Sequence, residues 1–463
     1  MSAEPERPDG EGTHPTDGPS GEPPQRPRVR NLKRSEGAAL IIVMTSIAVL
    51  LVTLTEFHAS TSTALVASTA DRDALKAEYL ARSGVNLTRL LLATEPQVRT
   101  VIGPILAAMT KTPSTPQLNV WDCADTILGA FSDYEANLAT ARSAGVDMSA
   151  ATGVGNTGGR FEVLAITENA MLNISRPVAN SDDVARQRQA LCLYGLLGGF
   201  QEPSPYDALF ERRDADGQFT TREDVIASII DWWDYDTERT TFDPAAGRVT
   251  SGGAEDDLYS RLRDPYDVKN APFDSIEELR LVRGMSDEMW ANLVEPDPDD
   301  PRARVLTIYG SGNVNVNYGS PQAIWCAICS QASTTTLCTD PAEATKFVTL
   351  LNTIRSMARI PMFQAGQNNT LLAFVRGQGL YQELAGFLGE DNPLLFKPIQ
   401  TPPGLENAFV DAARIFSLYV TGVVGQTRVR IHTVANLDET WNPPPPNTGG
   451  QTPMGVLQYW RMD

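Results

Sequence analysis

The 463-residue sequence predicts an α+β protein, with a long N-terminal helix packed on a small antiparallel sheet and a large inserted helical domain. Residues 38–55 are uncharged, and no Gly or Pro follows them before Gly84, which favours one long helix. Residues 413–435 alternate apolar and polar side chains around Gly425, which indicates a β-hairpin. Residues from about 201 to 400 read mostly as helix and are predicted to be inserted between distant parts of the sheet.

The uncharged run 38–55 predicts a membrane-spanning helix. Its eighteen residues give a helix of about 27 Å, enough to cross the hydrocarbon core of a bilayer. The basic residues that precede it are Arg26, Arg28, Arg30, Lys33 and Arg34. Because positive charge stays on the cytoplasmic side, the bulk of the chain is expected on the far side of the membrane.

A secretory signal peptide is the competing interpretation of this run. A signal peptide has a shorter apolar region and a cleavage site after it. Here the run passes without a break into an Ala-, Leu-, Lys- and Glu-containing segment that extends the helix to about Leu92. We therefore favour a retained anchor that continues as a helical stalk.

The first 37 residues are predicted to be a cytoplasmic leader. Residues 1–30 are rich in Pro, Gly and Glu and offer little to bury, so we expect them to be disordered. This leader contributes 6 − 7 = −1 to the net charge of −19, so the exported part is strongly acidic. Such acidity argues against nucleic acid and suits a soluble surface or calcium.

The start of the helix resembles the signature of type IV pilins and type II secretion pseudopilins. It has a basic leader that ends in Gly37, a small residue, Ala38, and an unbroken hydrophobic helix. The resemblance implies cleavage by a prepilin peptidase after Gly37 and N-methylation of Ala38. It also implies a pilin-like packing of the helix on the sheet.

Ile42 departs from the common pilin pattern, which has Glu at the fifth mature position. In the family, that Glu is thought to neutralise the N-terminal amine of a neighbouring subunit. A subunit with Ile42 offers no carboxylate to a subunit beyond it, which suits the end of a filament. Within the family this absence marks the K-type minor pseudopilin, and a globular part of this size also fits an end better than a thin shaft.

Two further strands are predicted in residues 159–175, with a turn near Glu168 and Asn169. The resulting organisation is a leader (1–37), a transmembrane and stalk helix (38–93), a first pilin-like part (94–200), an inserted helical domain (201–400), a returning sheet hairpin (401–436) and a Pro-rich tail (437–463). The sheet is therefore expected to combine segments that lie far apart in the sequence.

The inserted domain carries the densest resemblance to the K-type pseudopilins. The matching elements are Gly253-Ala254-Glu255-Asp256, Tyr259, Asn270, Pro272-Phe273 and Glu278 to Gly284. Residues 278–293 also predict a helix–turn–helix with Gly284 closing the first helix. The resemblance implies SAM-like (helix-hairpin-helix-like) repeats that serve as protein-interaction surface, and residues 312–317 resemble the strand before a second repeat.

DNA binding is the alternative use of such a helical hairpin. DNA-binding hairpins contact phosphate through a glycine-rich turn and surrounding basic residues. Here Ser286, Asp287 and Glu288 follow the turn, and the chain is acidic and exported. We therefore expect no nucleic acid partner.

Calcium is the ligand that the acidic residues of the insertion predict. The candidate residues are Asp234, Asp236 and Glu238, followed after a glycine-containing loop by Glu255, Asp256 and Asp257. Hard cations bind several carboxylate oxygens on a turn, and carboxylates packed together repel one another without a cation. The resemblance also implies calcium at these segments, whereas a solvated acidic loop is the alternative.

A second candidate calcium loop spans residues 212–223. Asp214, Asp216, Gly217 and Glu223 stand at EF-hand positions, but Arg212 occupies the first position, where an oxygen ligand is needed. A structural Asp-Gly turn is therefore expected.

The five cysteines are Cys123, Cys192, Cys326, Cys329 and Cys338. Their spacing allows zinc or a redox pair, but an exported compartment oxidises thiols. We expect a disulfide among Cys326, Cys329 and Cys338, and a second bond with Cys123 or Cys192 remains open.

No nucleophile–base arrangement, GxSxG elbow or phosphate-binding loop stands out, so no enzyme activity is predicted. The resemblance implies a minor pseudopilin at the tip of the type II secretion pseudopilus, in the inner membrane with its large domain in the periplasm. Implied partners are the I- and J-type minor pseudopilins, the major pseudopilin, prepilin peptidase, the secretin and cargo proteins. A type IV pilus minor pilin and a membrane-anchored periplasmic enzyme are the alternatives.

Overall fold

The computed structural model forms two compact units, Met1–Thr69 and Ala70–Asp463. The described residues are 36–110, 117–122, 124–132, 158–175, 183–200, 203–204, 206–210, 213, 217, 219–257, 259–297, 300–358, 361–390, 392–439 and 454–463. The predicted leader lies outside them as far as residue 35. Helix α1 (Glu36–Thr110) begins in the first unit and ends in the second.

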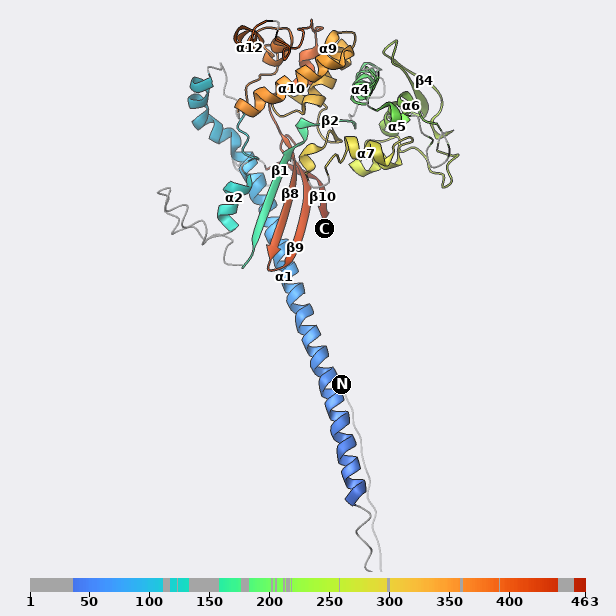
Figure 1. Cartoon of the computed structure of the whole chain (residues 1–463), viewed down its shortest axis with the longest axis vertical. Coiled ribbons are helices and arrows are strands. Elements are labelled where there is room, and N and C mark those ends of the chain that lie inside the picture. Colours follow the sequence, from blue (N-terminus) through green and yellow to red (C-terminus); the bar gives the residue numbers. More distant parts are fainter. Residues whose placement is uncertain are drawn as a thin grey trace, which may run out of the picture. The chain divides into compact units, whose positions relative to one another are not determined.

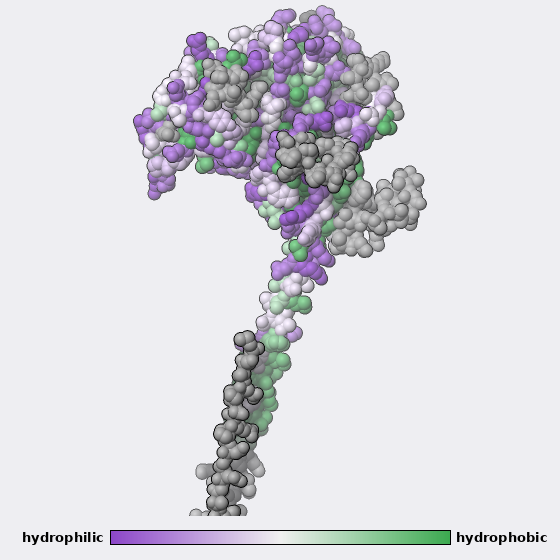
Figure 2. Space-filling view, turned by 180° about the vertical axis from the view of Figure 1, so that it is seen from behind, coloured by the Kyte–Doolittle hydropathy of each residue, from purple (hydrophilic) through white to green (hydrophobic). Residues whose placement is uncertain are grey.

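The first unit contains the apolar part of α1. Its large hydrophobic side chains, from Leu40 to Leu54, are exposed, and Figure 2 shows hydrophobic residues on the surface of this segment. The hydroxyls of Thr45, Thr53 and Thr55 donate to backbone carbonyls three or four residues earlier, so they need no external partner. By length and composition α1 is long and apolar enough to cross a membrane.

In the second unit, α1 lies along one face of a four-stranded sheet (Figure 1). Ala77, Leu80, Ala81 and Val85 recur on one helix face and are buried. The backbones approach closely at Gly422, where an added Cβ would lie 1.9 Å from the carbonyl oxygen of Ala77. Only glycine fits this contact between helix and sheet.

Helix α1 continues beyond the predicted end at residue 93 and includes Pro96 and Pro104. Around Pro96, the Glu95 carboxylate forms an ion pair with Arg99 at 3.6 Å and accepts a hydrogen bond from the Leu118 N–H at 2.8 Å. These contacts stabilise the turn that the proline weakens.

The sheet is antiparallel and has the order β1–β8–β9–β10. Its strands are β1 (Arg160–Thr167), β8 (Ile415–Val424), β9 (Thr427–Asn436) and β10 (Val456–Met462). The predicted hairpin is β8–β9, in which Val424 pairs with Thr427 and Gly425 adopts a φ of 58°. The sheet thus combines β1 with three strands from the end of the chain.

Two strand predictions differ from the structure. Strand β10 lies in the segment predicted as a tail. It pairs with β9, whose outer edge would otherwise have unpaired backbone groups. Strand β2 (Leu172–Asn173) pairs in parallel with β5 (Leu306–Thr307) and not with a neighbouring part of the chain. A two-residue strand carries no period in the sequence, so its partner could not be inferred.

The remaining elements form a mostly helical region. Its α-helices are α4 (Asp183–Leu196), α5 (Asp207–Phe210), α6 (Arg222–Trp233), α7 (Asp287–Leu293), α8 (Pro321–Ala332), α9 (Thr336–Thr339), α10 (Pro341–Ala358), α11 (Thr370–Val375) and α12 (Leu380–Leu388). Short 3-10 helices are η3 (Glu168–Ala170), η4 (Glu255–Asp257), η5 (Ile276–Leu281), η6 (Pro301–Ala303) and η7 (Leu405–Ala408). A hairpin of β3 (Glu238–Asp243) and β4 (Arg248–Ala254) and a parallel pair of β6 (Val314–Asn315) with β7 (Phe409–Val410) complete it.

These elements pack around two main hydrophobic cores. The smaller core joins α1, α2 (Ala124–Ser132), β1, β8 and β9. The larger core includes Leu172, Ile174 and the buried face of α4 together with α6, α8 and α10. Helix α4 therefore packs with the helical region, although the sequence analysis assigned it to the first pilin-like part.

The predicted helix–turn–helix is present with a tighter first element, the 3-10 helix η5. Gly284 follows it with a φ of 85° and lies so close to Thr220 that an added Cβ would be 2.5 Å from Thr220 Cγ2. Ser286 then caps α7 by accepting the Met289 N–H at 3.2 Å. The tight turn is thus fixed by its contact with the segment before α6.

Two disulfides lie in the larger core. Cys192 in α4 bonds to Cys326 in α8, and Cys329 in α8 bonds to Cys338 in α9. The bonds span 134 and 9 residues of sequence, respectively. Of the two cysteines predicted as partners for a second bond, Cys192 is bonded to Cys326. The other, Cys123, lies outside the described residues.

We predict that the long-range bond contributes more to stability than the short one. The double variant Cys192→Ala/Cys326→Ala should lose about 3–5 kcal/mol of unfolding free energy, because the unfolded chain gains a much larger loop. Cys329→Ala/Cys338→Ala is the matched control and should lose less. Urea unfolding of both variants measures the difference, and equal losses would contradict the prediction.

Candidate metal site

The candidate site begins at the C-terminal end of α6. Thr221 and Asp224 form a capping box at the start of this helix, and its residues from Val225 to Trp233 are buried. The last turn places Asp231 and Asp234 three residues apart, on the same side of the helix. Figure 1 shows α6 beside the β3–β4 hairpin, which follows it in the chain.

The hairpin returns a third carboxyl group to the end of α6. Glu255 follows β4 directly, and its N–H donates to the Thr237 carbonyl at 3.5 Å. Asp231, Asp234 and Glu255 are each at most 4% exposed, and each offers one oxygen within 4.8 Å of the others. Three acidic side chains from both ends of a hairpin therefore converge in the protein interior.

Hydrogen bonds satisfy only part of this cluster. Asp231 accepts the Thr240 N–H at 2.8 Å, and Arg186 donates to Asp234 at 3.3 Å and to Asp236 at 3.2 Å. Within the described part of the chain, Asp234 Oδ1 and both carboxylate oxygens of Glu255 are buried and have no hydrogen-bond partner. Buried oxygens without a donor are unfavourable and are typical of a site that takes a ligand.

Burial raises the pKa of all three carboxyl groups. The pKa rises to about 6 for Asp231, about 7 for Asp234 and about 8 for Glu255. In each case desolvation is the largest cause, and the negative charge of nearby acidic groups adds to it for Asp234 and Glu255. A bound cation would reverse this effect, because it stabilises the charged forms.

Asn270 is a fourth polar group at this site. It lies close enough to Glu255 to lower the pKa of that carboxyl, and its own Oδ1 is buried without a partner in the described chain. Among the described residues it is the non-glycine residue with a positive φ, 48°. Asn adopts this left-handed conformation more readily than other non-glycine residues, so the chain can turn here beside the carboxyl groups.

The structure brings together some of the predicted calcium ligands and not others. Asp234 and Glu255 are in the cluster, and Asp236 lies beside it through the shared Arg186. Glu238 and Asp257 are exposed and outside it, and the side chain of Asp256 lies outside the described residues.

Sequence reasoning missed Asp231 and Asn270. Asp231 stands among the apolar residues of α6 in the sequence, so it was not recognised as a ligand. Its spacing of three residues from Asp234 indicates that both side chains lie on one side of the helix. In the second candidate loop, Arg212, Asp214 and Asp216 lie outside the described residues.

The donor set fits a hard cation. Asp231, Asp234, Glu255 and Asn270 offer only oxygen atoms, which calcium prefers over nitrogen or sulfur ligands. A divalent cation would also neutralise the negative charge of the carboxylates, because the single positive charge of Arg186 is too small to do so.

Comparison with known proteins finds a related family. Residues 170–295 match the family model "Type II secretion system (T2SS), protein K". The match covers 126 of the 463 residues, and this segment of the chain is similar to protein K. The matched residues include the entire carboxylate cluster, the β3–β4 hairpin and the η5–α7 segment.

A solved structure is also similar to this chain. It is "The Crystal Structure of the GspK-GspI-GspJ complex from enterotoxigenic Escherichia coli Type 2 Secretion System", with 13% sequence identity and a TM-score of 0.36. The match covers 66% of this chain and 80% of that chain. No curated protein matches the sequence.

The match of residues 170–295 agrees with the predicted resemblance to K-type proteins of type II secretion systems. The coarse fold is as predicted, since the structure has a long helix, a small antiparallel sheet and a helical region.

Proposed function

We propose that this protein is a minor pseudopilin that forms the tip of the type II secretion pseudopilus, where it initiates and caps assembly for protein export. The observation that carries the proposal is Ile42, five residues after Gly37 in an uncharged helix. A helix without a carboxylate at this place has nothing to pair with the N-terminal amine of a subunit above it. The buried packing of apolar helices would make that unpaired amine unfavourable.

The proposal includes processing and orientation. Prepilin peptidase would cleave after Gly37, and Ala38 would become the methylated N-terminus. The basic residues before Gly37 would remain on the cytoplasmic side, and residues 70–463 would lie in the periplasm. Because the related structure is titled as a complex with GspI and GspJ, the I- and J-type minor pseudopilins are the proposed neighbours, with the major pseudopilin below them.

The helical region is the proposed contact surface. We infer that its SAM-like segments face the secretin or cargo, which a tip subunit would meet first. Calcium is the proposed ligand of Asp231, Asp234, Glu255 and Asn270. When bound, it would hold the carboxylates at both ends of the β3–β4 hairpin in their charged forms and so stabilise this part of the surface.

Immunogold labelling of isolated pseudopili tests the tip placement. We expect gold only at fibre ends, and mass spectrometry of the same fibres should find methylated Ala38 as the first residue. Gly37→Val should prevent cleavage and remove the label from fibres. Gly129→Val is a matched control, since an added Cβ at Gly129 meets nothing within 4 Å. Label scattered along shafts would contradict the proposal.

A further inference from the structure

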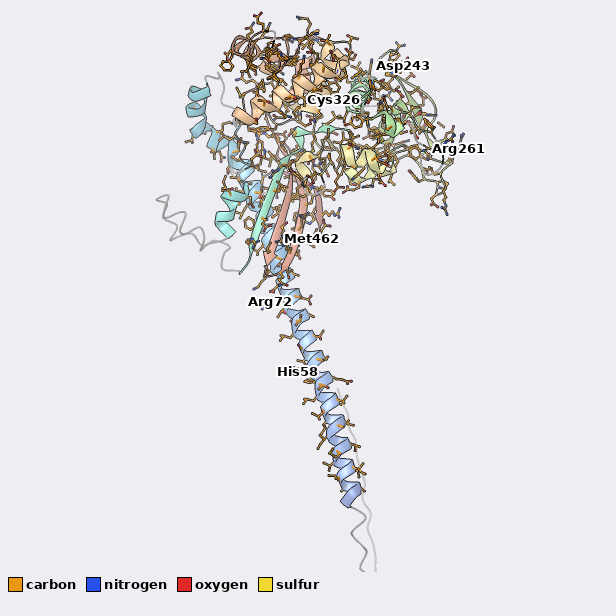
Figure 3. All side chains as sticks on the ribbon, in the orientation of Figure 1. His58, Arg72, Asp243, Arg261, Cys326 and Met462 are labelled. Carbon is orange, nitrogen blue, oxygen red and sulfur yellow. A yellow bond between two sulfur atoms is a disulfide. The ribbon has the colours of Figure 1, made fainter. Side chains whose placement is uncertain are left out.

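A small cavity of about 120 Å³ lies where α4, α8, β2, η7 and the start of β6 meet. Cys192 is part of its lining, and Figure 3 labels Cys326, the disulfide partner of Cys192. The cavity therefore lies beside the long-range disulfide of the larger core. Sites for drug-sized ligands usually measure about 300–1,000 Å³, so this cavity suits a smaller molecule or one residue at the end of a chain.

The charge of the cavity lining comes from one arginine, Arg188. None of the described residues that line the cavity is Asp or Glu, although the chain as a whole has 57 acidic and 38 basic residues. Arg188 is exposed on α4 and forms no ion pair within the described ranges. Glu406, which precedes the lining residue Asn407, accepts the Gly404 N–H at 3.1 Å. A guanidinium without a countercharge, in a cavity without carboxylates, favours one negatively charged group of a ligand.

Amide side chains supply most of the other polar groups of the lining. The side chains of Asn313, Gln331 and Asn407 form no hydrogen bond with the described residues, so their N–H groups can donate to an anion. Gln189 is only 8% exposed, and its Nε2 donates to the Ile174 carbonyl at 2.6 Å. The Oε1 of Gln189 is buried without a partner in the described chain. The lining thus combines donors for an anion with an acceptor that needs an N–H group.

We propose that this cavity binds an α-carboxylate that stands next to an N–H group, as at a polypeptide C-terminus or in a small N-acylated amino acid. Arg188 pairs with the carboxylate through two hydrogen bonds, and the unpartnered amides donate to it. The adjacent N–H donates to Gln189 Oε1. A small apolar side chain on the same residue packs against Leu172 and Ala408, which also line the cavity. Phosphate fits less well, because one arginine balances one negative charge and the acidic chain repels a dianion.

Fluorescence anisotropy with a defined probe tests this inference. The full-length protein, in a neutral detergent, is titrated against the hexapeptide fluorescein-Gly-Ser-Gly-Ser-Gly-Val with a free C-terminal carboxylate. The same peptide with a C-terminal amide should bind at least about tenfold more weakly, because it loses the charge-assisted hydrogen bonds.

Competition with N-acetylvaline separates the two sources of this ligand chemistry. N-acetylvaline presents the same end as the peptide and should displace it. Equal affinity of the two compounds would identify a small free acid as sufficient, and tighter binding of the peptide would identify a chain end. Both results agree with the proposal, whereas a failure of N-acetylvaline to displace the peptide would contradict it.

Charge variants locate the site. Arg188→Glu should weaken binding of the free-acid peptide by at least about tenfold, and Gln331→Glu, which keeps the side-chain volume, by about fivefold, since each adds a repulsion. The matched controls are Arg428→Glu in β9 and Gln382→Glu in α12, both exposed and outside the cavity, which should change binding less than about twofold. No binding, equal binding of the amidated peptide, or equal effects of a variant and its control would overturn the inference.

Discussion

Calcium is expected to raise the melting temperature of the protein by about 3 °C at pH 8 and by less than half of that at pH 5.5. A ligand present at a hundred times its dissociation constant stabilises the folded state by about 2.7 kcal/mol. The cluster of Asp231, Asp234 and Glu255 provides this binding energy only when its carboxylates are charged. Protons and calcium therefore compete for the same oxygens.

The pH dependence without calcium should have a defined sign. The folded-state pKa of these groups is raised to about 6, 7 and 8, whereas the unfolded values are near 4. Between these limits the folded state binds more protons than the unfolded state. The free energy of unfolding in chelator should therefore fall as the pH rises from about 4 to about 8, and calcium should remove most of that fall.

Calorimetry of a Glu255→Gln variant checks the assignment. This change removes one buried charge, so we expect the variant to lose the calcium gain and to be no less stable than the wild type in chelator at pH 8. Asp267→Asn, at an exposed position outside the cluster, is the control and should keep the full gain. Identical melting curves for the wild type in calcium and in chelator at pH 8 would refute the calcium site.

Replacing Glu168 by Ala is expected to destabilise the protein by about 3–5 kcal/mol. The Glu168 carboxylate is fully buried in η3, pairs with Arg304 and accepts hydrogen bonds from the hydroxyls of Thr307 in β5 and Ser417 in β8. Without it, the Arg304 guanidinium would remain buried with no countercharge. This group joins the sheet to the start of the helical region, so its loss should affect both.

Urea unfolding measures this effect, and a second variant separates charge from packing. Glu168→Leu/Arg304→Met removes both charges at similar volume and should recover a large part of the loss, because no uncompensated charge is left. Glu162→Ala, in an ion pair with Arg160 that is about half exposed, should lose less than about 1 kcal/mol. A loss at Glu168 no larger than at Glu162 would show that the buried pair does not couple these elements.

Elements that have a local pattern could be predicted from the sequence. The uncharged run from Ala38 and the alternation on both sides of Gly425 each extend over many residues. The acidic residues at the end of α6 stand close together in the sequence. Such patterns determine which face of a helix or strand is buried before any partner is known. They also carried the family resemblance, since the motifs around Glu255 and Gly284 are continuous stretches.

The amino-acid order by itself thus determined the long apolar helix, the hairpin and the acidic character of the residues after that helix. Only the tertiary structure decided that Asp231 and Asn270 join Asp234 and Glu255, that Cys192 bonds to Cys326, and that β10 closes the sheet edge. These contacts join residues far apart in the chain, or depend on which side of a helix is buried beside a returning loop. The local propensity of a segment does not predict these contacts, because the packing of the two cores determines which distant residues meet.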